Sequence, residues 1–225
     1  MTKDFVSEHI VKHYDEHIRQ LIPGYVLVHQ HIQALLYAHS NEQAKHVLII
    51  GCGTGYELEY LLTCFPNWKF VACDLSATML AKAHARIQAI GKEASVEFIC
   101  GDFAAHCSTE TFDLVLSVLV SHFVAHKDKQ TFFAQIADVL KQHGMFLTFD
   151  LMAFQQQNEV QILQYIVQQQ GLTARQTTVM LERLKDDYAV LTEVETRQYF
   201  QQAGLENTQK FIQLAGYSGF YAFKA

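Results

Sequence analysis

The chain has 225 residues, of which half are hydrophobic and 18% are charged. This composition is typical of one globular domain and excludes a disordered or fibrous protein. The formal net charge is −6, and no cluster of Lys or Arg provides the basic surface that DNA binding requires. No apolar stretch is long enough to cross a bilayer, and the N-terminus lacks the apolar core of a signal peptide. We therefore expect a cytoplasmic protein without a membrane partner.

Cysteine usage agrees with that compartment. The five cysteines are odd in number and form no C-x-x-C pair, so we predict free thiols rather than a disulfide framework. They are Cys52, Cys64, Cys73, Cys100 and Cys107.

Two helical patterns occupy residues 5–40 and are broken at Ile22-Pro23-Gly24. In the first, the segment His13-Tyr14-Asp15-Glu16-His17 matches the H-x-x-E-H pattern of one class of zinc peptidases. The motif stands apart from the predicted core, and we interpret its histidines as a packed or solvated helix face. We predict no metal site.

From residue 46 onward, short apolar runs alternate with helical patterns. One of these helices is expected to begin at Asp128 and to end at Gly144. Near-continuous apolar strands separated by helices predict a parallel sheet covered on both faces. The predicted strands are residues 46–50, 68–74, 95–100, 112–119 and 145–151.

Glutamine-rich helical patterns follow at 155–187. Capping boxes at Thr173/Gln176 and Thr192/Glu195 mark the starts of two helices, and residues 209–223 predict a β-hairpin. We expect a single domain with four parts: an N-terminal helical cap (1–44), a cofactor-binding core (45–150), a helical insertion or lid (151–190), and a C-terminal helix with a hairpin (191–225).

A glycine-rich turn connects the first strand to the following helix. Gly51, Gly53 and Gly55 allow positive φ angles and leave backbone N–H groups free at a helix N-terminus. Asp74 ends the second strand 23 residues after Gly51, where a carboxylate can accept hydrogen bonds from two ribose hydroxyls. Together these features predict a site for a nucleoside-containing cofactor.

The spacing of the glycines separates the cofactor classes. Tyr56 stands where the third glycine of the dinucleotide motif G-x-G-x-x-G would be, which disfavours a pyrophosphate at the helix start. No Gly-Lys-Ser/Thr follows, so the turn is not a P-loop. A nicotinamide-dependent oxidoreductase is the least favoured alternative, and a catalytically silent cofactor-binding module is another.

Five segments in order resemble the signature segments of class I S-adenosylmethionine-dependent methyltransferases. They are VLIIGCGTGYELEYL, VACDLSATMLAKA, FICGDF, FDLVLSVLVSHF and LKQHGMFLTFDL, and the resemblance covers roughly residues 45–150. It implies an α/β fold with a seven-stranded, mostly parallel Rossmann-like sheet, helices on both faces, and an antiparallel last strand. It also implies S-adenosylmethionine as the cofactor and S-adenosylhomocysteine as its product.

The same resemblance assigns cofactor contacts by position. The glycine turn would lie along the methionine part, Asp74 would bind the ribose, and the segments after the second and third strands would line the adenine pocket. Three residues of the N-terminal cap, Tyr14, Arg19 and Tyr25, would close over the cofactor. The implied cofactor-binding residues of the core are Gly51, Cys52, Gly53, Thr54, Gly55, Asp74, Leu75, Met79, Asp102, Phe103, Ser117 and Leu119.

The predicted reaction is direct in-line methyl transfer to a small-molecule acceptor. His122 is the candidate proton acceptor, although a histidine with a structural or supporting role is the favoured explanation of this position. No Asn/Asp-Pro-Pro-Tyr motif follows the fourth strand, which removes the usual signature for methylating exocyclic base amines. The accepting atom stays open, and so does a modified tRNA base.

A weaker resemblance links YDEHIRQLIPGY and residues 171–205 to the branch that contains the carboxy-S-adenosylmethionine synthases. In that branch a basic residue of the insertion holds the extra carboxylate of the cofactor, and Arg183 occupies the corresponding place here. This comparison also suggests a homodimer. The turn Gly53-Thr54-Gly55 has the methyltransferase form instead, so such a synthase is the runner-up.

Overall fold

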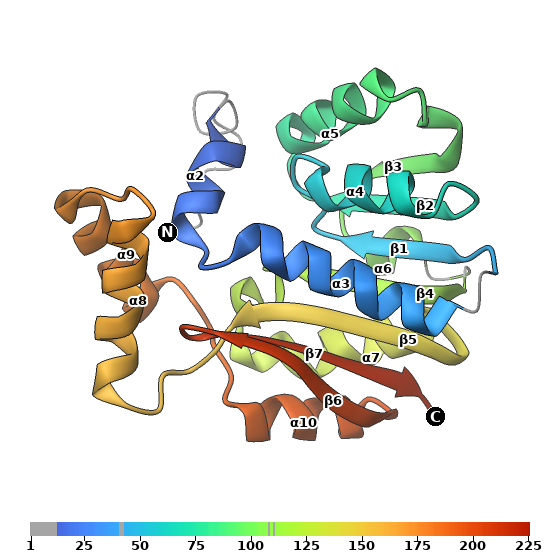
Figure 1. Cartoon of the computed structure of the whole chain (residues 1–225). Coiled ribbons are helices and arrows are strands. Elements are labelled where there is room, and N and C mark those ends of the chain that lie inside the picture. Colours follow the sequence, from blue (N-terminus) through green and yellow to red (C-terminus); the bar gives the residue numbers. More distant parts are fainter. Residues whose placement is uncertain (1–12, 41–42, 108, 110) are drawn as a thin grey trace.

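Seven strands form one sheet in the computed structural model, which describes residues 13–40, 43–107, 109 and 111–225 (Figure 1). The strand order is β3-β2-β1-β4-β5-β7-β6, and β7 runs antiparallel to both β5 and β6, while the other neighbouring pairs are parallel. This confirms the predicted fold class. The strands are β1 (His46–Ile50), β2 (Lys69–Asp74), β3 (Val96–Cys100), β4 (Phe112–Val118), β5 (Leu140–Leu151), β6 (Leu205–Leu214) and β7 (Tyr217–Lys224).

Helices cover both faces of the sheet (Figure 1). One buried cluster joins α3, α4 and α5 to the strands, and a second joins α6, α7 and α10 to them. The helices are α2 (Tyr14–Leu21), α3 (Tyr25–Ser40), α4 (Tyr56–Cys64), α5 (Ala77–Ala89), α6 (Phe103–His106), α7 (Lys129–Val139), α8 (Gln157–Gln169), α9 (Ala174–Asp186) and α10 (Glu193–Gln202).

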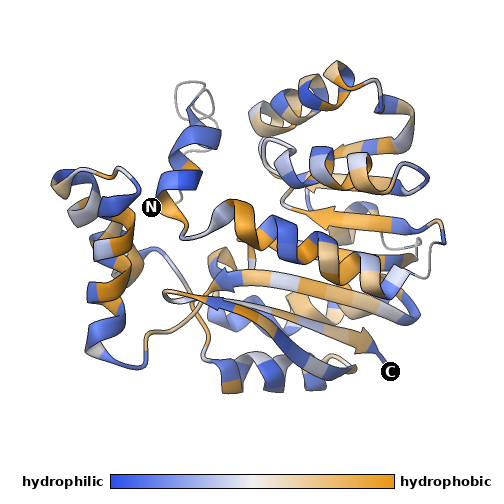
Figure 2. Ribbon diagram, viewed as in Figure 1, coloured by the Kyte–Doolittle hydropathy of each residue, from blue (hydrophilic) through white to orange (hydrophobic). Residues whose placement is uncertain are grey.

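Strand β1 shows why its sequence is uniformly apolar. Val47 and Ile49 belong to one buried cluster, whereas Leu48 and Ile50 belong to the other. Because alternate side chains point to opposite faces and both faces are covered, no position of the strand centre suits a polar residue. The hydropathy colouring of β1 reflects this arrangement (Figure 2).

The capping boxes and the hairpin appear as predicted. The hydroxyls of Thr173 and Thr192 accept the backbone N–H of the third residue of α9 and α10, and the side chains of Gln176 and Glu195 complete both boxes. The predicted helix end at Gly144 is wrong, because α7 ends at Val139. The buried residue Leu140 instead pairs with Phe112 of β4, and a register shift then carries the chain into the rest of β5.

Helices α2, α8 and α9 lie near the carboxyl-terminal ends of the central strands β1, β4 and β5 (Figure 1). Leu163 and Val167 of α8 and Met180 of α9 are buried in the same cluster as the α3 side of the sheet. The division of the chain into cap, core, insertion and C-terminal part stays a prediction, and residues 1–12 of the cap lie outside the described residues. No helix within the described residues is both long enough and apolar enough to span a membrane.

Candidate cofactor site

A cavity of about 660 Å³ opens at the carboxyl-terminal ends of β1, β2 and β4. Its size falls in the range of about 300–1,000 Å³ that is usual for small-ligand pockets. Most of the residues expected to bind the cofactor contribute to its wall. These are Tyr14, Tyr25, Gly51, Cys52, Gly53, Thr54, Asp74, Leu75, Met79, Asp102, Phe103 and Leu119.

Asp74 is fixed at the end of β2 by backbone donors. The N–H of Gly53 donates to Oδ2 at 2.8 Å, and the N–H of Ser76 donates to Oδ1 at 2.8 Å. Burial raises the pKa of this carboxyl above its ordinary value, and the hydrogen bonds from the backbone partly oppose that shift. The carboxylate is thus tied to the glycine turn and retains lone pairs on the side of the cavity.

The glycines of the turn have different physical roles. Gly55 has φ +77° at the start of α4, and a Cβ there would lie 2.9 Å from Cβ of Ala83 and 3.0 Å from its Cα. Gly53 has φ +53°, and nothing lies within 4 Å of the position its Cβ would take. Gly55 therefore allows α4 to pack on α5, whereas Gly53 leaves open space in the cavity wall.

The side expected to hold adenine is formed by residues after β2 and β3. Met79 and Phe103 are almost fully buried, and Leu75 is 80% exposed. Asp102 caps α6 by accepting the N–H of Ala104 at 3.2 Å. An apolar wall next to the carboxylate of Asp74 is a suitable surface for a nucleoside.

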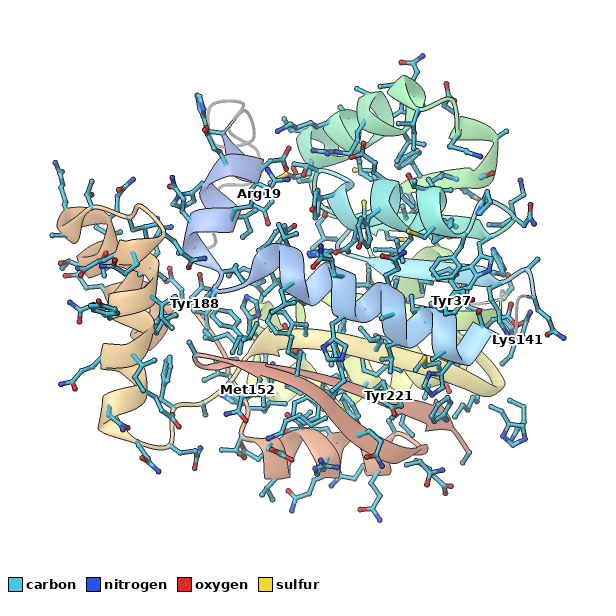
Figure 3. The ribbon with its side chains drawn as sticks, viewed as in Figure 1. Arg19, Tyr37, Lys141, Met152, Tyr188 and Tyr221 are labelled. Carbon is cyan, nitrogen blue, oxygen red and sulfur yellow. The ribbon has the colours of Figure 1, made fainter. Side chains whose placement is uncertain are left out.

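Besides Gly55, three residues predicted to bind the cofactor or substrate do not line the cavity. Ser117 is fully buried in β4, and its Oγ has no hydrogen-bond partner among the described residues. Arg19 lies on α2 with its guanidinium over the ring of Tyr56, 4.9 Å from the centroid (Figure 3). Arg183 lies on α9, is half exposed, and is 4.0 Å from the carboxylate of Asp187. Their roles toward the cofactor stay predictions.

His122 belongs to a separate buried cluster beyond β4. Its Nδ1 lies 2.8 Å from Oδ1 of Asp150, and the hydroxyl of Thr148 donates to Oδ2 of the same carboxylate. Its ring also contacts the rings of Phe123 and Tyr188, whose centroids are 4.4 and 5.1 Å away. His122 does not line the large cavity, so its predicted role as proton acceptor stays a prediction.

Next to this cluster is a cavity of about 10 Å³, barely the space of one water molecule. Lys129 of α7 lines it and is fully buried. Its Nζ donates to the carbonyl of Ser121 at 2.5 Å, and burial lowers its pKa to about 8. Lys129 thereby fixes the segment that carries His122 and Phe123.

Several wall residues were not predicted from the sequence. The segment after β4 contributes an apolar rim, and the first turn of α4 contributes Tyr56 and Glu57. The only sequence signal for Glu57 was its position two residues after the last glycine. The apolar residues of the rim are Val120, Phe123, Val124, Ala125 and Phe132, and the acidic residue Asp128 lies among them.

The described wall residues include four acids, Glu57, Asp74, Asp102 and Asp128. This lining favours a ligand that carries positive charge. Among the described residues, no group of three or more His, Cys, Asp or Glu side chains is arranged to hold a metal ion.

A family profile described as "Methyltransferase domain" matches residues 47–144, the segment that holds the glycine turn, Asp74 and β4. Over these residues the chain is similar to methyltransferase domains. The sheet order and the position of the cavity at the ends of β1, β2 and β4 agree with this assignment.

Comparisons with individual proteins also find methyltransferases. The chain is 27% identical over 125 residues to malonyl-[acyl-carrier protein] O-methyltransferase 2 of Ilyobacter polytropus, covering 55% of this chain and 46% of that protein. The chain thus spans about half the length of this curated relative. A putative O-methyltransferase structure from Nostoc punctiforme has a TM-score of 0.68 at 19% identity, covering 98% of this chain and 60% of that one.

The magnesium protoporphyrin IX methyltransferase of Synechocystis, solved with bound S-adenosylhomocysteine, is similar in fold. It has a TM-score of 0.64 at 15% identity, covering 90% of this chain and 84% of that chain.

Proposed function

We propose that this protein binds S-adenosylmethionine in the 660 Å³ cavity and transfers its methyl group to a small-molecule acceptor. The observation that carries the proposal is the hydrogen bond from Gly53 to Asp74, which holds the carboxylate proposed to bind the ribose beside an open glycine turn. Both residues lie inside the domain that matches the methyltransferase profile.

The cavity fits this cofactor in three respects. The space over Gly53 is empty, so a ligand can approach the backbone of the turn closely. The buried side chains of Met79 and Phe103 provide an apolar wall for adenine. The carboxylates of the wall suit a ligand with a positively charged sulfur.

Catalysis in this site rests on holding two reactants in line and keeping water away. When bound, S-adenosylmethionine supplies an activated methyl group on a sulfonium. An acceptor that takes up this methyl group would release a proton, which a side chain of the site would receive. The rim residues Phe123 and Phe132 would shield this reaction from solvent, which favours the charge-dispersing step.

His122 is proposed as the group that receives the proton. Its Nδ1 faces an oxygen of Asp150, which orients the ring and would stabilise the imidazolium that forms. The ring contacts Phe123, a wall residue of the large cavity, so a movement of that side chain would connect the two.

The acceptor is proposed to be small. The curated relative in Ilyobacter polytropus is named for malonyl-[acyl-carrier protein], and we do not extend that substrate to this chain. The four wall carboxylates would repel an acceptor that carries negative charge. The proposed homodimer and the role of Arg183 are tested by light scattering with and without cofactor. A methylation assay on unmodified and modified tRNA tests the open alternative.

Isothermal titration with S-adenosylmethionine, S-adenosylhomocysteine and NADH tests the cofactor. We expect binding of the first two in the micromolar range and none of NADH, and the variant Asp74→Asn should weaken both by about 10- to 100-fold. Asp113→Asn is the matched control, because Asp113 accepts the backbone N–H of His46 at 2.8 Å and does not line the cavity. Equal affinities in wild type and D74N would refute the proposed site.

A further inference from the structure

Glu57 lies in the first turn of α4, lines the large cavity, and is held on one side by His29 of α3. Oε2 of Glu57 is 3.3 Å from Nε2 of His29, and Nδ1 of His29 is 2.8 Å from the carbonyl oxygen of Tyr25. A carbonyl oxygen only accepts, so Nδ1 carries a proton. The contact with Glu57 is then a hydrogen bond only if the pair holds a second proton. This pairing fixes one oxygen of the carboxyl group.

The other oxygen, Oε1, is buried and has no hydrogen-bond partner among the described residues. The side chain of Glu57 is 11% exposed, so solvent barely compensates for the missing partner. A buried carboxylate oxygen without a donor is costly, and native proteins usually provide one. Because Glu57 is a wall residue, a side-chain rotation that turns Oε1 toward the cavity would let a bound ligand donate to it and remove this cost.

The surroundings of Glu57 select the kind of donor. Tyr14, Tyr25 and Tyr56 line the same cavity, and the rings of Tyr25 and Tyr56 are 5.4 Å apart. Burial raises the pKa of the Tyr14 and Tyr25 hydroxyls, and the charge of Glu57 raises it further, so both phenols are neutral at physiological pH. Aromatic faces beside a carboxylate attract cations.

Arg19 gives an internal example of this attraction. Its guanidinium lies over the ring of Tyr56, although Arg19 itself does not line the cavity. A ligand cation that also satisfies Oε1 must carry N–H groups, which a sulfonium lacks and an ammonium group has.

We propose that Oε1 of Glu57 accepts a hydrogen bond from an ammonium group bound in the cavity, beside the rings of Tyr14 and Tyr25. The inference rests on the proposed function and assigns a subsite within it. Two ligands offer this group: the amino-acid end of the cofactor, or an amine that accepts the methyl group. The proposal is for the ammonium subsite, and the experiment distinguishes its source.

The test uses full-length wild type, Glu57→Gln and the control Glu59→Gln. Glu59 is on the same helix and loses the same charge, but it pairs with Arg86 and does not line the cavity. Calorimetry measures binding of S-adenosylhomocysteine, and of 5′-methylthioadenosine, which lacks the amino-acid end. Ethylamine, dimethylamine and ethanolamine are then titrated into protein saturated with S-adenosylhomocysteine.

If the cofactor supplies the ammonium group, E57Q weakens S-adenosylhomocysteine about 10- to 100-fold and leaves 5′-methylthioadenosine unchanged. If the acceptor supplies it, both nucleosides bind E57Q as they bind wild type, and amine binding to the saturated complex is lost. E59Q should match wild type in every titration.

The subsite is refuted if E57Q binds all probes as wild type does, or if it loses both nucleosides equally. If wild type binds neither nucleoside, the proposed function fails and the subsite fails with it. A ligand-side measurement covers the case in which E57Q does not fold. The deaminated analogue of S-adenosylhomocysteine and the amine titrations are then run on wild type alone, and indifference to both amino groups refutes the subsite.

Discussion

Alanine substitutions at three glycines would separate the structural and ligand-facing roles of the turn at the end of β1. Gly91, Gly53 and Gly55 all have positive φ, at +64°, +53° and +77°. Each Gly→Ala change therefore carries a backbone cost of about 1–2 kcal/mol. Gly91, which follows α5 and does not line the cavity, measures that cost by itself, because nothing lies within 4 Å of its Cβ position.

Gly55→Ala adds a steric cost. Its Cβ would meet both Cβ and the backbone Cα of Ala83 at about 3 Å, so α5 itself must move. Overpacking of this kind costs about 1–3 kcal/mol, which brings the total loss of unfolding free energy to about 2–5 kcal/mol. Gly53→Ala has no such neighbour, and its stability should equal that of G91A, but its methyl group enters the cavity and should weaken S-adenosylhomocysteine at least about tenfold.

Urea denaturation followed by circular dichroism gives the free energies, and calorimetry gives the affinities. In thermal melts each kcal/mol should lower the Tm by about 2–4 °C in a chain of this length. Equal stability of G55A and G91A would show that the close packing of α4 on α5 is absent. Equal cofactor affinity of G53A and G91A would show that Gly53 does not face the bound cofactor.

Three further predictions concern ionisable side chains. Burial raises the pKa of Asp74, so cofactor affinity should fall on acidification at a higher pH than for an ordinary aspartate, and calorimetry across pH should show no such fall in D74N. Burial lowers the pKa of Lys129 from 10.5 to about 8, so the wild-type protein gains stability as the pH rises through that interval. The unfolding free energy of Lys129→Met minus that of wild type, measured in urea, should therefore fall by about 2 kcal/mol between pH 7 and pH 10. A difference that stays constant would contradict a buried amine that titrates in this range. His122→Gln should lower kcat about 10²- to 10⁴-fold with cofactor affinity unchanged, whereas exposed His39→Gln should have no effect, and an active H122Q would remove His122 from the proton pathway.

Most of the sheet could be predicted from the sequence because its strands are short apolar runs bounded by turn residues. The ends of β1 and β2 were equally readable, since glycines and an acid at fixed spacing have few structural explanations. Gly144 was misread as a helix end because a glycine alone does not reveal that Leu140 is drawn into the sheet by its buried partner Phe112.

The rest of the site depends on tertiary contacts that no local pattern encodes. Phe123 reaches the wall only because the segment after β4 folds back over the cavity. Glu57 depends on His29, which is distant in the chain. The exposed positions of Arg19 and Arg183 follow from how α2 and α9 pack, and a resemblance by position does not fix that packing.

The placement of β7 has a consequence for how the protein is made. β7 follows β6 in the chain but lies between β5 and β6 in the sheet. A ribosome-bound chain that has emerged only through β6 therefore cannot complete the sheet, and the flank of β5 stays uncovered until Tyr217–Lys224 arrives. In the half of the sheet that contains β1 and β2, every strand meets its partners earlier in synthesis. Folding should therefore begin in that half, and the β6–β7 hairpin should complete the sheet after residue 224 has been translated.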